Sequence, residues 1–218
     1  MSITEASSTN PLLYLNIHTH QPLAEDEVTV PSYGLHPWDV TAALDIPQAI
    51  QAAIIPHTSL PLEGGTGEGP GPDFFLIGEC GLDRLCASSY DLQLAAFKEQ
   101  IALSEQLQRP LILHCVRALD DVLRLKRGTR QPWIWHGFRG KPQQLQQLLA
   151  HGFYVSFGFR HNAESLRACP ADRLFLETDD DPRPIRLLYA TAAALRQTTP
   201  EALAAQLQEN LFGMTNDE

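Results

Sequence analysis

Seven short runs of mostly apolar residues recur along the chain, and they are rich in isoleucine, leucine, valine and aromatic residues. Runs of this length and composition are typical of β-strands that are covered on both faces. The predicted strands cover residues 11–18, 32–37, 74–79, 110–115, 132–137, 152–158 and 173–178.

Helical patterns occupy most of the intervals between these runs. The clearest covers residues 89–108, where Leu94, Phe97 and Ile101 recur at helical spacing. The last predicted helix follows Thr199 and Pro200, a typical helix start. The predicted helices cover residues 42–55, 89–108, 117–127, 141–150, 162–168, 184–196 and 200–212.

Strands and helices that alternate in this way predict an α/β fold with parallel strands and right-handed crossovers. The segment 61–73 interrupts the alternation with five glycines and three prolines, and we expect a flexible surface loop there. A second domain boundary is not evident, so residues 1–218 are expected to form a single domain.

Composition and charge narrow the possible functions. The formal net charge of −10 argues against a broad basic surface for nucleic acid, but it is compatible with a nucleic-acid enzyme whose local positive charge comes from metal ions. The chain has neither an apolar run long enough to span a membrane nor a secretory signal, so we expect a cytoplasmic protein without membrane contact. The four cysteines form no CxxC pair and are expected to be free thiols.

Six of the seven predicted strands end in an imidazole or a carboxylate. The carboxyl ends of parallel strands face one side of a sheet or barrel, so these groups should lie together. A single strand-end histidine is more often a hydrogen-bonded polar group than a ligand, but a mixed set this large suits Zn, Mn, Fe or Ni. The residues are His18, with His20 two positions further on the same face, and then His36, Glu79, His114, His136 and Asp179.

The ordered set of motifs resembles the TatD-type metal-dependent deoxyribonucleases, which belong to the amidohydrolase-like metallohydrolases. The resemblance implies a TIM-like (β/α) barrel and a metal-dependent hydrolase that cleaves phosphodiester bonds, with single-stranded DNA or short DNA fragments as substrate. The motifs are HTH (18–20), GLHP (34–37), IGECGLD (77–83), LILHCVRA (111–118), WHGFRG (135–140), GFYVSFG (152–158) and FLETD (175–179).

The same resemblance implies a site for two divalent metal ions, with Zn, Mg or Mn as candidates. One ion would be held by His18, His20 and Asp179, and the other by His114 and His136. Glu79 would bridge the two ions, a role that suits a carboxylate because it can neutralise and space two cations.

The catalytic roles that the resemblance implies fall on four residues. A hydroxide shared by the two metals would attack the phosphorus, with Asp179 as the general base and Glu79 as the bridge. His36 and Arg117 would bind the scissile phosphate, Arg117 through charge-assisted hydrogen bonds. We expect a monomer, because the sequence contains no long apolar surface helix.

Two features depart from the family pattern. Asn16 occupies a position where the family usually has an aspartate, and an amide would support His18 more weakly. The interval between His20 and His36 is too short for a helix and a further strand. We therefore predict that one βα unit after the first strand is missing, which leaves seven strands and a breach in the barrel wall.

Other functions and roles remain open at this stage. A metal-dependent hydrolase of a small ester, amide or phosphoester is one alternative, and a catalytically poor relative that binds a partner is another. Trp38 is expected either to pack in the core or to form part of the cleft wall. Asp83 is expected to cap or hold the loop after Glu79. Arg139 is expected either to be a charged residue at the rim of the site or to contact a phosphate.

Overall fold

Strands and helices alternate through the parts of the chain that the computed structural model describes, residues 13–55 and 74–214. The predicted loop at 61–73 lies outside the described residues. The elements are β1 (Tyr14–Asn16), β2 (Glu27–Thr29), β3 (Ser32–Tyr33), α1 (Ile46–Ile54), β4 (Leu76–Asp83), α2 (Tyr90–Leu107), β5 (Leu111–Val116), α3 (Leu119–Lys126), β6 (Trp133–Trp135), α4 (Pro142–Ala150), β7 (Tyr154–Phe157), α5 (Ala163–Ala168), the 3-10 helix η2 (Ala171–Arg173), β8 (Leu174–Leu176), α6 (Ile185–Arg196) and α7 (Pro200–Gly213).

All the strand pairs are parallel, as the sequence predicts. Six strands form one sheet in the order β3-β4-β5-β6-β7-β8, and β1 pairs with β2 in a second sheet. Backbone hydrogen bonds join the two sheets between β1 and β8: Ile17 N donates to Leu176 O at 3.1 Å, and Asp179 N donates to His18 O at 3.1 Å. The strand ends that carry His18 and Asp179 are therefore neighbours.

The segment after β1 changes the predicted strand count. The described residues form eight strands in place of seven, because the chain passes from β2 to β3 through Val30 and Pro31 with no crossover between them. The first part of this segment pairs with β1 and the second part pairs with β4. At the junction Leu76 N donates to Pro31 O at 2.9 Å. The expected loss of a crossover helix is confirmed, since residues 17–31 are all described and contain no helix.

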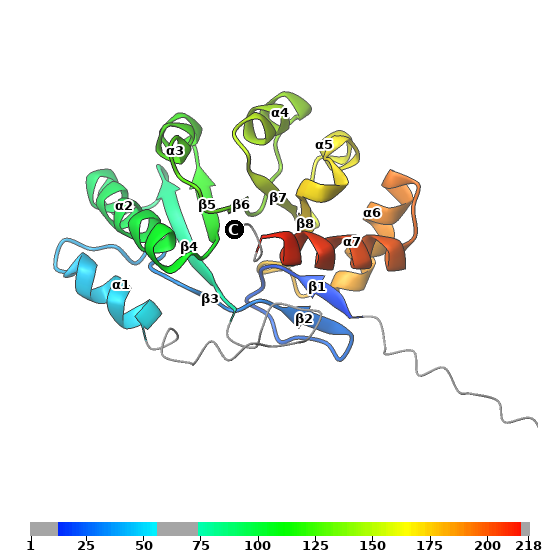
Figure 1. Ribbon diagram of the computed structural model, residues 1–218, viewed down its shortest axis with the longest axis horizontal. Helices are drawn as coiled ribbons and strands as arrows, with labels where there is room; N and C mark the ends of the chain where they lie inside the picture. Colours follow the sequence, from blue (N-terminus) through cyan, green and yellow to red (C-terminus); the bar gives the residue numbers. More distant parts are fainter. Residues whose placement is uncertain (1–12, 56–73, 215–218) are drawn as a thin grey trace, which may run out of the picture.

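Helices α1 to α6 form an arc outside the strands (Figure 1). Helices α2 to α6 follow one another along the outer side, while α7 lies close to β1. Thr199 caps α7 as predicted, with its Oγ1 accepting from Ala202 N at 3.1 Å. Asn210 Nδ2 donates to Leu174 O at 2.9 Å, at the beginning of β8. Helix α7 therefore covers the amino ends of the strands and leaves the carboxyl ends free.

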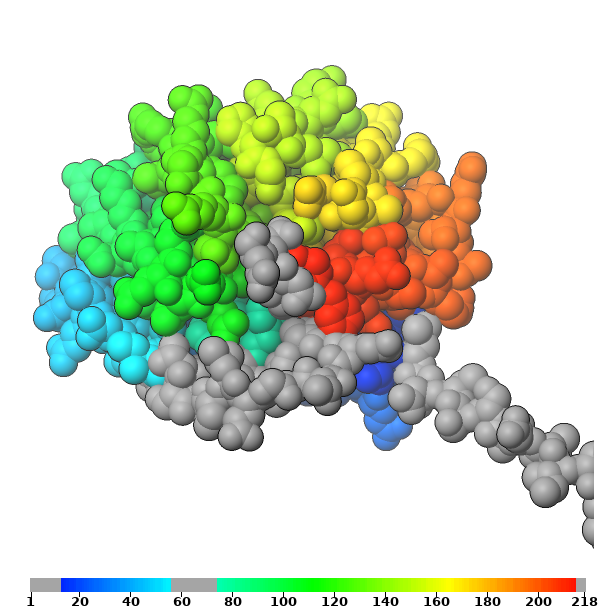
Figure 2. Space-filling model, viewed as in Figure 1, coloured from blue at the N-terminus to red at the C-terminus, as the bar shows by residue number. Residues whose placement is uncertain are grey.

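A single apolar core lies between the strands and the outer helices. Phe97 of α2 packs against Trp133 of β6 with ring centroids 5.4 Å apart, and both side chains are fully buried. Each such side chain contributes about 1.5–3 kcal/mol through burial. The outer surface follows the same order of helices, with α7 exposed on the face shown in Figure 2. All four cysteines are free, as expected.

None of the helices in the described part of the chain is both long enough and apolar enough to cross a lipid bilayer.

Candidate metal centre

The backbone of β4 places Glu79 on a bulge. The register between β4 and β5 shifts between Ile77 and Cys80, and Glu79 lies inside that shift. A bulge of this kind turns a side chain away from the regular alternation of the strand. Gly81 has a φ of +138°, and a Cβ there would lie 2.0 Å from the carbonyl oxygen of His114. The glycine therefore allows β4 and β5 to approach closely at the level of the site.

The carboxylate of Glu79 lies between two groups of histidines. Its Oε1 is 2.8 Å from His114 Nδ1 and 2.6 Å from His136 Nε2. Its Oε2 is 3.1 Å from His18 Nε2 and 3.8 Å from His20 Nε2. Each oxygen thus faces a different pair of imidazoles, which is the arrangement that a bridging carboxylate needs.

Asp179 lies beside the first pair of histidines. Its Oδ1 is 4.0 Å from His18 Nε2 and 3.8 Å from His20 Nε2. Pairing of the two strand ends holds it there, since His20 N donates to Asp179 O at 3.0 Å. Burial, together with the nearby charge of Glu177, raises the pKa of Asp179. A carboxylate with a raised pKa is a better proton acceptor than an ordinary aspartate.

The donor set suits divalent cations. Burial acts to raise the pKa of Glu79, but hydrogen bonds with the surrounding histidines hold that pKa far below its ordinary value. His18 Nε2 is buried, and although it lies 3.1 Å from Glu79 Oε2 it makes no hydrogen bond of regular geometry. Ligand atoms of imidazoles and carboxylates come within 4.8 Å of one another in several combinations, an approach compatible with Zn–N and Zn–O bonds of about 2.0–2.2 Å. The combinations are His18 with His20 and Asp179, His18 with Glu79 and His136, His36 with Glu79 and His114, and His136 with Glu177 and Asp179.

Glu177 belongs to this centre and was not among the predicted site residues. It is fully buried, and its Oε1 lies 3.3 Å from His136 Nδ1 and accepts from Gly137 N at 2.6 Å. Burial opposes the charged form of His136, yet the carboxylates of Glu177 and Glu79 raise its pKa well above the ordinary value. The motif FLETD held the signal, because residues two apart on an extended strand point to the same face.

Asp83 supports His114 from the opposite side to Glu79. Its Oδ2 is 3.3 Å from His114 Nε2 and accepts from Trp38 Nε1 at 2.7 Å. Its Oδ1 accepts from Leu85 N at 2.7 Å, so it also braces the loop after β4. The hydrogen bond to Asp83 holds the indole of Trp38 in place at the wall of the cleft, although 62% of this side chain is exposed.

The two predicted phosphate-binding residues occupy different places. His36 Nε2 lies 3.5 Å from Glu79 Oε1, so His36 is part of the cluster. Arg117 lies outside it, exposed at the carboxyl end of β5 in a groove that His114 and His136 also line. Its backbone is in the left-handed region, with a φ of 55°. The structure therefore brings the six predicted metal ligands together with His36 and leaves Arg117 at the rim.

Asn16 contacts the end of β8. Its Nδ2 donates to Thr178 Oγ1 at 2.9 Å, and its Oδ1 accepts from Thr178 N at 3.0 Å. Both atoms of the amide group are therefore used to join β1 to the segment that carries Asp179.

Comparison with known proteins places this chain in a family. The family described as TatD related DNase matches residues 9–214. The protein named 3'-5' ssDNA/RNA exonuclease TatD from Erwinia billingiae (strain Eb661) is 30% identical over 197 residues, which are 73% of this chain and 74% of that protein. An uncharacterised metal-dependent hydrolase, YabD of Bacillus subtilis (strain 168), is 28% identical over 158 residues.

The similarity is partial in length. The match to the Bacillus protein spans 62% of each chain, which is less than two thirds of that relative. Among solved structures, YJJV of Escherichia coli K12, described as a TatD homolog, superposes with a TM-score of 0.68 at 21% identity. That match covers 89% of this chain and 79% of the other, and it shows a shared fold. The family match over residues 9–214 decides the relationship: this chain belongs to the TatD related DNase family.

Proposed function

We propose that this protein is a metal-dependent phosphodiesterase that degrades single-stranded DNA from its ends. The observation that carries the proposal is the position of Glu79, with one carboxylate oxygen facing His18 and the other facing His136. A carboxylate placed in this way suits two divalent cations held side by side, the usual arrangement in enzymes that cleave phosphodiester bonds.

Six side chains are proposed to hold the ions. Two divalent cations there would lower the pKa of water and stabilise negative charge on the phosphate. Zn, Mn and Mg are the candidates, and the imidazole-rich donor set favours Zn over Mn and Mg. The proposed ligands are His18, His20 and Asp179 for one ion, His114 and His136 for the other, and Glu79 between them.

Three of the chain's own residues are proposed to act on the substrate. Asp179 would accept a proton at Oδ1 from the attacking water, and burial, which raises its pKa, supports this role. His36 lies beside Glu79 and would donate to an oxygen of the scissile phosphate. Arg117, in the groove that His114 and His136 also line, would hold that phosphate by charge-assisted hydrogen bonds.

The cleft around the cluster supports a substrate larger than a simple ester. It has a volume of about 730 Å³ and is lined by the cluster, by β3 and by Trp38. An exposed indole suits stacking against a nucleobase, which contributes about 1–3 kcal/mol per base. The name of the Erwinia relative specifies single-stranded DNA and RNA, which supports the same substrate class.

We propose that a single copy of the chain forms the site, because every member of the cluster comes from this chain. Light scattering on the purified protein should give the mass of one chain, 24.2 kDa. A dimer mass would contradict this part of the proposal.

The test is a nuclease assay with single-stranded oligonucleotides labelled at one end or the other. Chelation should abolish release of nucleotides, and Zn²⁺, Mn²⁺ or Mg²⁺ should restore it. Glu79→Ala should abolish activity and lower the metal content at both positions, whereas Glu164→Ala, an exposed acid of α5, should change neither. Full activity in Glu79→Ala would refute the bridging role.

The same assay separates the alternatives. Hydrolysis of a small phosphoester without cleavage of any oligonucleotide would favour a small-molecule hydrolase. Two bound metals without activity on either substrate class would favour a binding protein. The net charge of −10 makes weak binding to long nucleic acid the expected result in both of those cases.

A further inference from the structure

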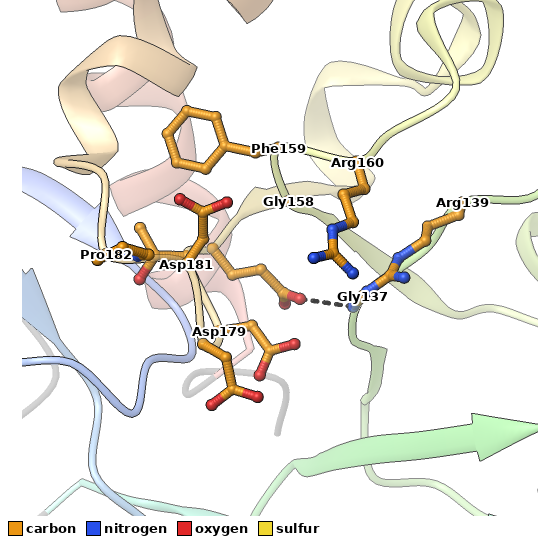
Figure 3. A pocket seen from close by; sticks show the side chains of 11 residues that line it. Gly137, Arg139, Gly158, Phe159, Arg160, Asp179, Asp181 and Pro182 are labelled. Atoms are coloured by element: carbon orange, nitrogen blue, oxygen red, sulfur yellow. Dashed lines mark hydrogen bonds between the residues drawn. The ribbon is translucent and has the colours of Figure 1, made fainter.

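A cavity of about 230 Å³ lies beside the metal centre, at the carboxyl ends of β6, β7 and β8. Arg139 follows β6 and Arg160 follows β7, and both guanidinium groups point into the same part of the cavity (Figure 3). The glycines at 137 and 158 line the cavity without a side chain to fill it. Two cationic groups thus face an open space next to Asp179.

Most of the carboxylates around this cavity already have partners. Asp181 forms a bidentate pair with Arg183, with distances of 2.8 Å and 2.6 Å, and Arg183 lies 3.9 Å over the ring of Phe159. The pKa of Asp181 is lowered to about 2, mainly by the hydrogen bonds from Arg183 and to a smaller extent by Arg160. Arg183 therefore neutralises the acid that lies on the same side of the cavity as Phe159.

Two of the other acids in the lining also have partners. Glu177 accepts from Gly137 N at 2.6 Å and lies beside His136, while Asp179 faces His18 and His20. Asp180 is the remaining carboxylate of the lining, and it is exposed to solvent.

The two arginines have no such partners. In residues 13–55 and 74–214, neither Arg139 nor Arg160 forms a hydrogen bond or an ion pair through its guanidinium group. A guanidinium group presents a rigid set of N–H donors that matches phosphate oxygens two at a time. Two guanidinium groups that have no other partner and point into one cavity are therefore suited to bind a single anion between them.

We propose that Arg139 and Arg160 bind the phosphate adjacent to the scissile phosphate on the substrate strand. The inference rests on the proposed nuclease function and adds a subsite to it. Asp179 lines both this cavity and the larger cleft that holds the cluster, so the two spaces adjoin. A strand whose scissile phosphate lies at the cluster can therefore place its next phosphate between the two arginines.

Short substrates test the subsite directly. The thymidine dinucleotide with a single phosphodiester bond lacks the second phosphate, and the same dinucleotide phosphorylated at its 5' or its 3' end supplies it. The wild-type protein should cleave one of the phosphorylated dinucleotides with kcat/KM raised roughly tenfold or more, mainly through KM, because charge-assisted hydrogen bonds are strong. Arg139→Gln and Arg160→Gln should each remove most of this gain and leave cleavage of the unphosphorylated dinucleotide unchanged.

Arg130→Gln is the matched control. Arg130 is an exposed arginine just before β6, at the end of the strand opposite to the cavity. It removes the same charge from the protein and should retain the full preference for the phosphorylated dinucleotide. Equal losses on substrates with and without the second phosphate, or an equal loss in Arg130→Gln, would overturn the subsite.

A binding measurement keeps the subsite separate from the nuclease proposal. Titration calorimetry with inorganic phosphate, on the protein freed of metal by a chelator, should give an affinity about tenfold lower for Arg139→Gln and Arg160→Gln than for Arg130→Gln. The same affinity in all three variants would overturn the subsite even if the protein is a nuclease. A wild-type protein that cleaves no oligonucleotide with any metal would refute the nuclease, while the difference in phosphate affinity would still support the arginine site.

Discussion

Glu177, which is fully buried, pairs with His136 at the metal centre, with Glu177 Oε1 3.3 Å from His136 Nδ1. Burial opposes the ionised form of Glu177, but the charge of His136 and the hydrogen bond between them lower the pKa of Glu177. An ionised carboxylate can only accept, so Nδ1 carries the hydrogen of this hydrogen bond. The opposite nitrogen, Nε2, lies 2.6 Å from Glu79, and its lone pair becomes available to a metal ion once His136 gives up its second proton.

Glu177→Gln should therefore weaken metal binding without removing a ligand. The amide can present its NH2 group to Nδ1 and so no longer fixes the tautomer, and losing a partner of this kind typically costs 10- to 100-fold in metal affinity. Calorimetric titration with Zn²⁺ should show the loss. Glu164→Gln, on the exposed face of α5, should bind like the wild type. Wild-type affinity in Glu177→Gln would show that Glu177 does not orient His136.

The strand-end pattern was enough to predict the cluster, and the limits of that prediction have physical causes. His18 and His20 were recognisable because residues two apart on a strand share a face, and the carboxyl ends of parallel strands meet. Glu177 and Asp179 follow the same rule. The pairing of Glu177 with His136, however, depends on the relative positions of the ends of β6, β7 and β8, which the pattern of residues along the chain does not specify.

The strand count was harder to predict, for a different reason. Residues 27–30 alternate polar and apolar positions over only four residues, and Pro31, which has no N–H to donate, separates them from the predicted strand at 32–37. The first half becomes the separate strand β2 by pairing with β1, whereas β3 pairs with β4. Tertiary pairing, which local sequence does not encode, produced the eighth strand.

Asn16→Asp, which restores the acid usual in the family, should destabilise the metal-free protein. Asn16 is fully buried, and its Nδ2 donates to Thr178 Oγ1, a bond that a carboxylate cannot make. The hydroxyl of Thr178 is already directed to Thr19 Oγ1 at 2.8 Å, so it is not free to replace that bond. An unmade buried hydrogen bond costs about 1–3 kcal/mol, which urea unfolding would measure.

Asn162→Asp is the control for this substitution. Asn162 caps α5 by accepting from Ser165 N at 3.0 Å, a role in which aspartate serves equally well. Its free energy of unfolding should stay within about 0.5 kcal/mol of the wild type. Equal stability of Asn16→Asp and the wild type would mean that Thr178 reorients to donate to the new carboxylate.

Metal ions should stabilise the folded protein against heat and urea. A ligand that binds only the folded state adds about 2.7 kcal/mol per site when its concentration is 100 times Kd. Zn²⁺ or Mn²⁺ should therefore raise the unfolding midpoint, and a chelator should reverse the change. Glu79→Ala should lose most of the gain, whereas His151→Asn, at the end of α4 and outside the cluster, should retain it. A midpoint that does not respond to any of the metals would contradict the proposed site.

Lys126 should make stability depend on pH above neutrality. Burial lowers the pKa of Lys126 from its ordinary 10.5 to about 8, and the ammonium group donates to Gln131 O at 2.9 Å. Below pH 8 the lysine is charged in both the folded and the unfolded state, so the cost of burying the charge is fully present. Between about pH 8 and 10.5 the unfolded chain binds more protons, so this group makes the folded state more stable as the pH rises.

Lys126→Met isolates that contribution, because methionine has no titrating group and can occupy the space of the aliphatic part of the lysine side chain. Urea unfolding from pH 7.5 to 10 should show the free energy of the wild type rising relative to that of Lys126→Met, by at most about 1.4 kcal/mol per pH unit. Lys98→Met, which removes an exposed lysine of α2, should keep the wild-type dependence on pH. Parallel curves for Lys126→Met and the wild type would show that Lys126 has the same pKa in both states, because only a difference between the two states can produce a slope.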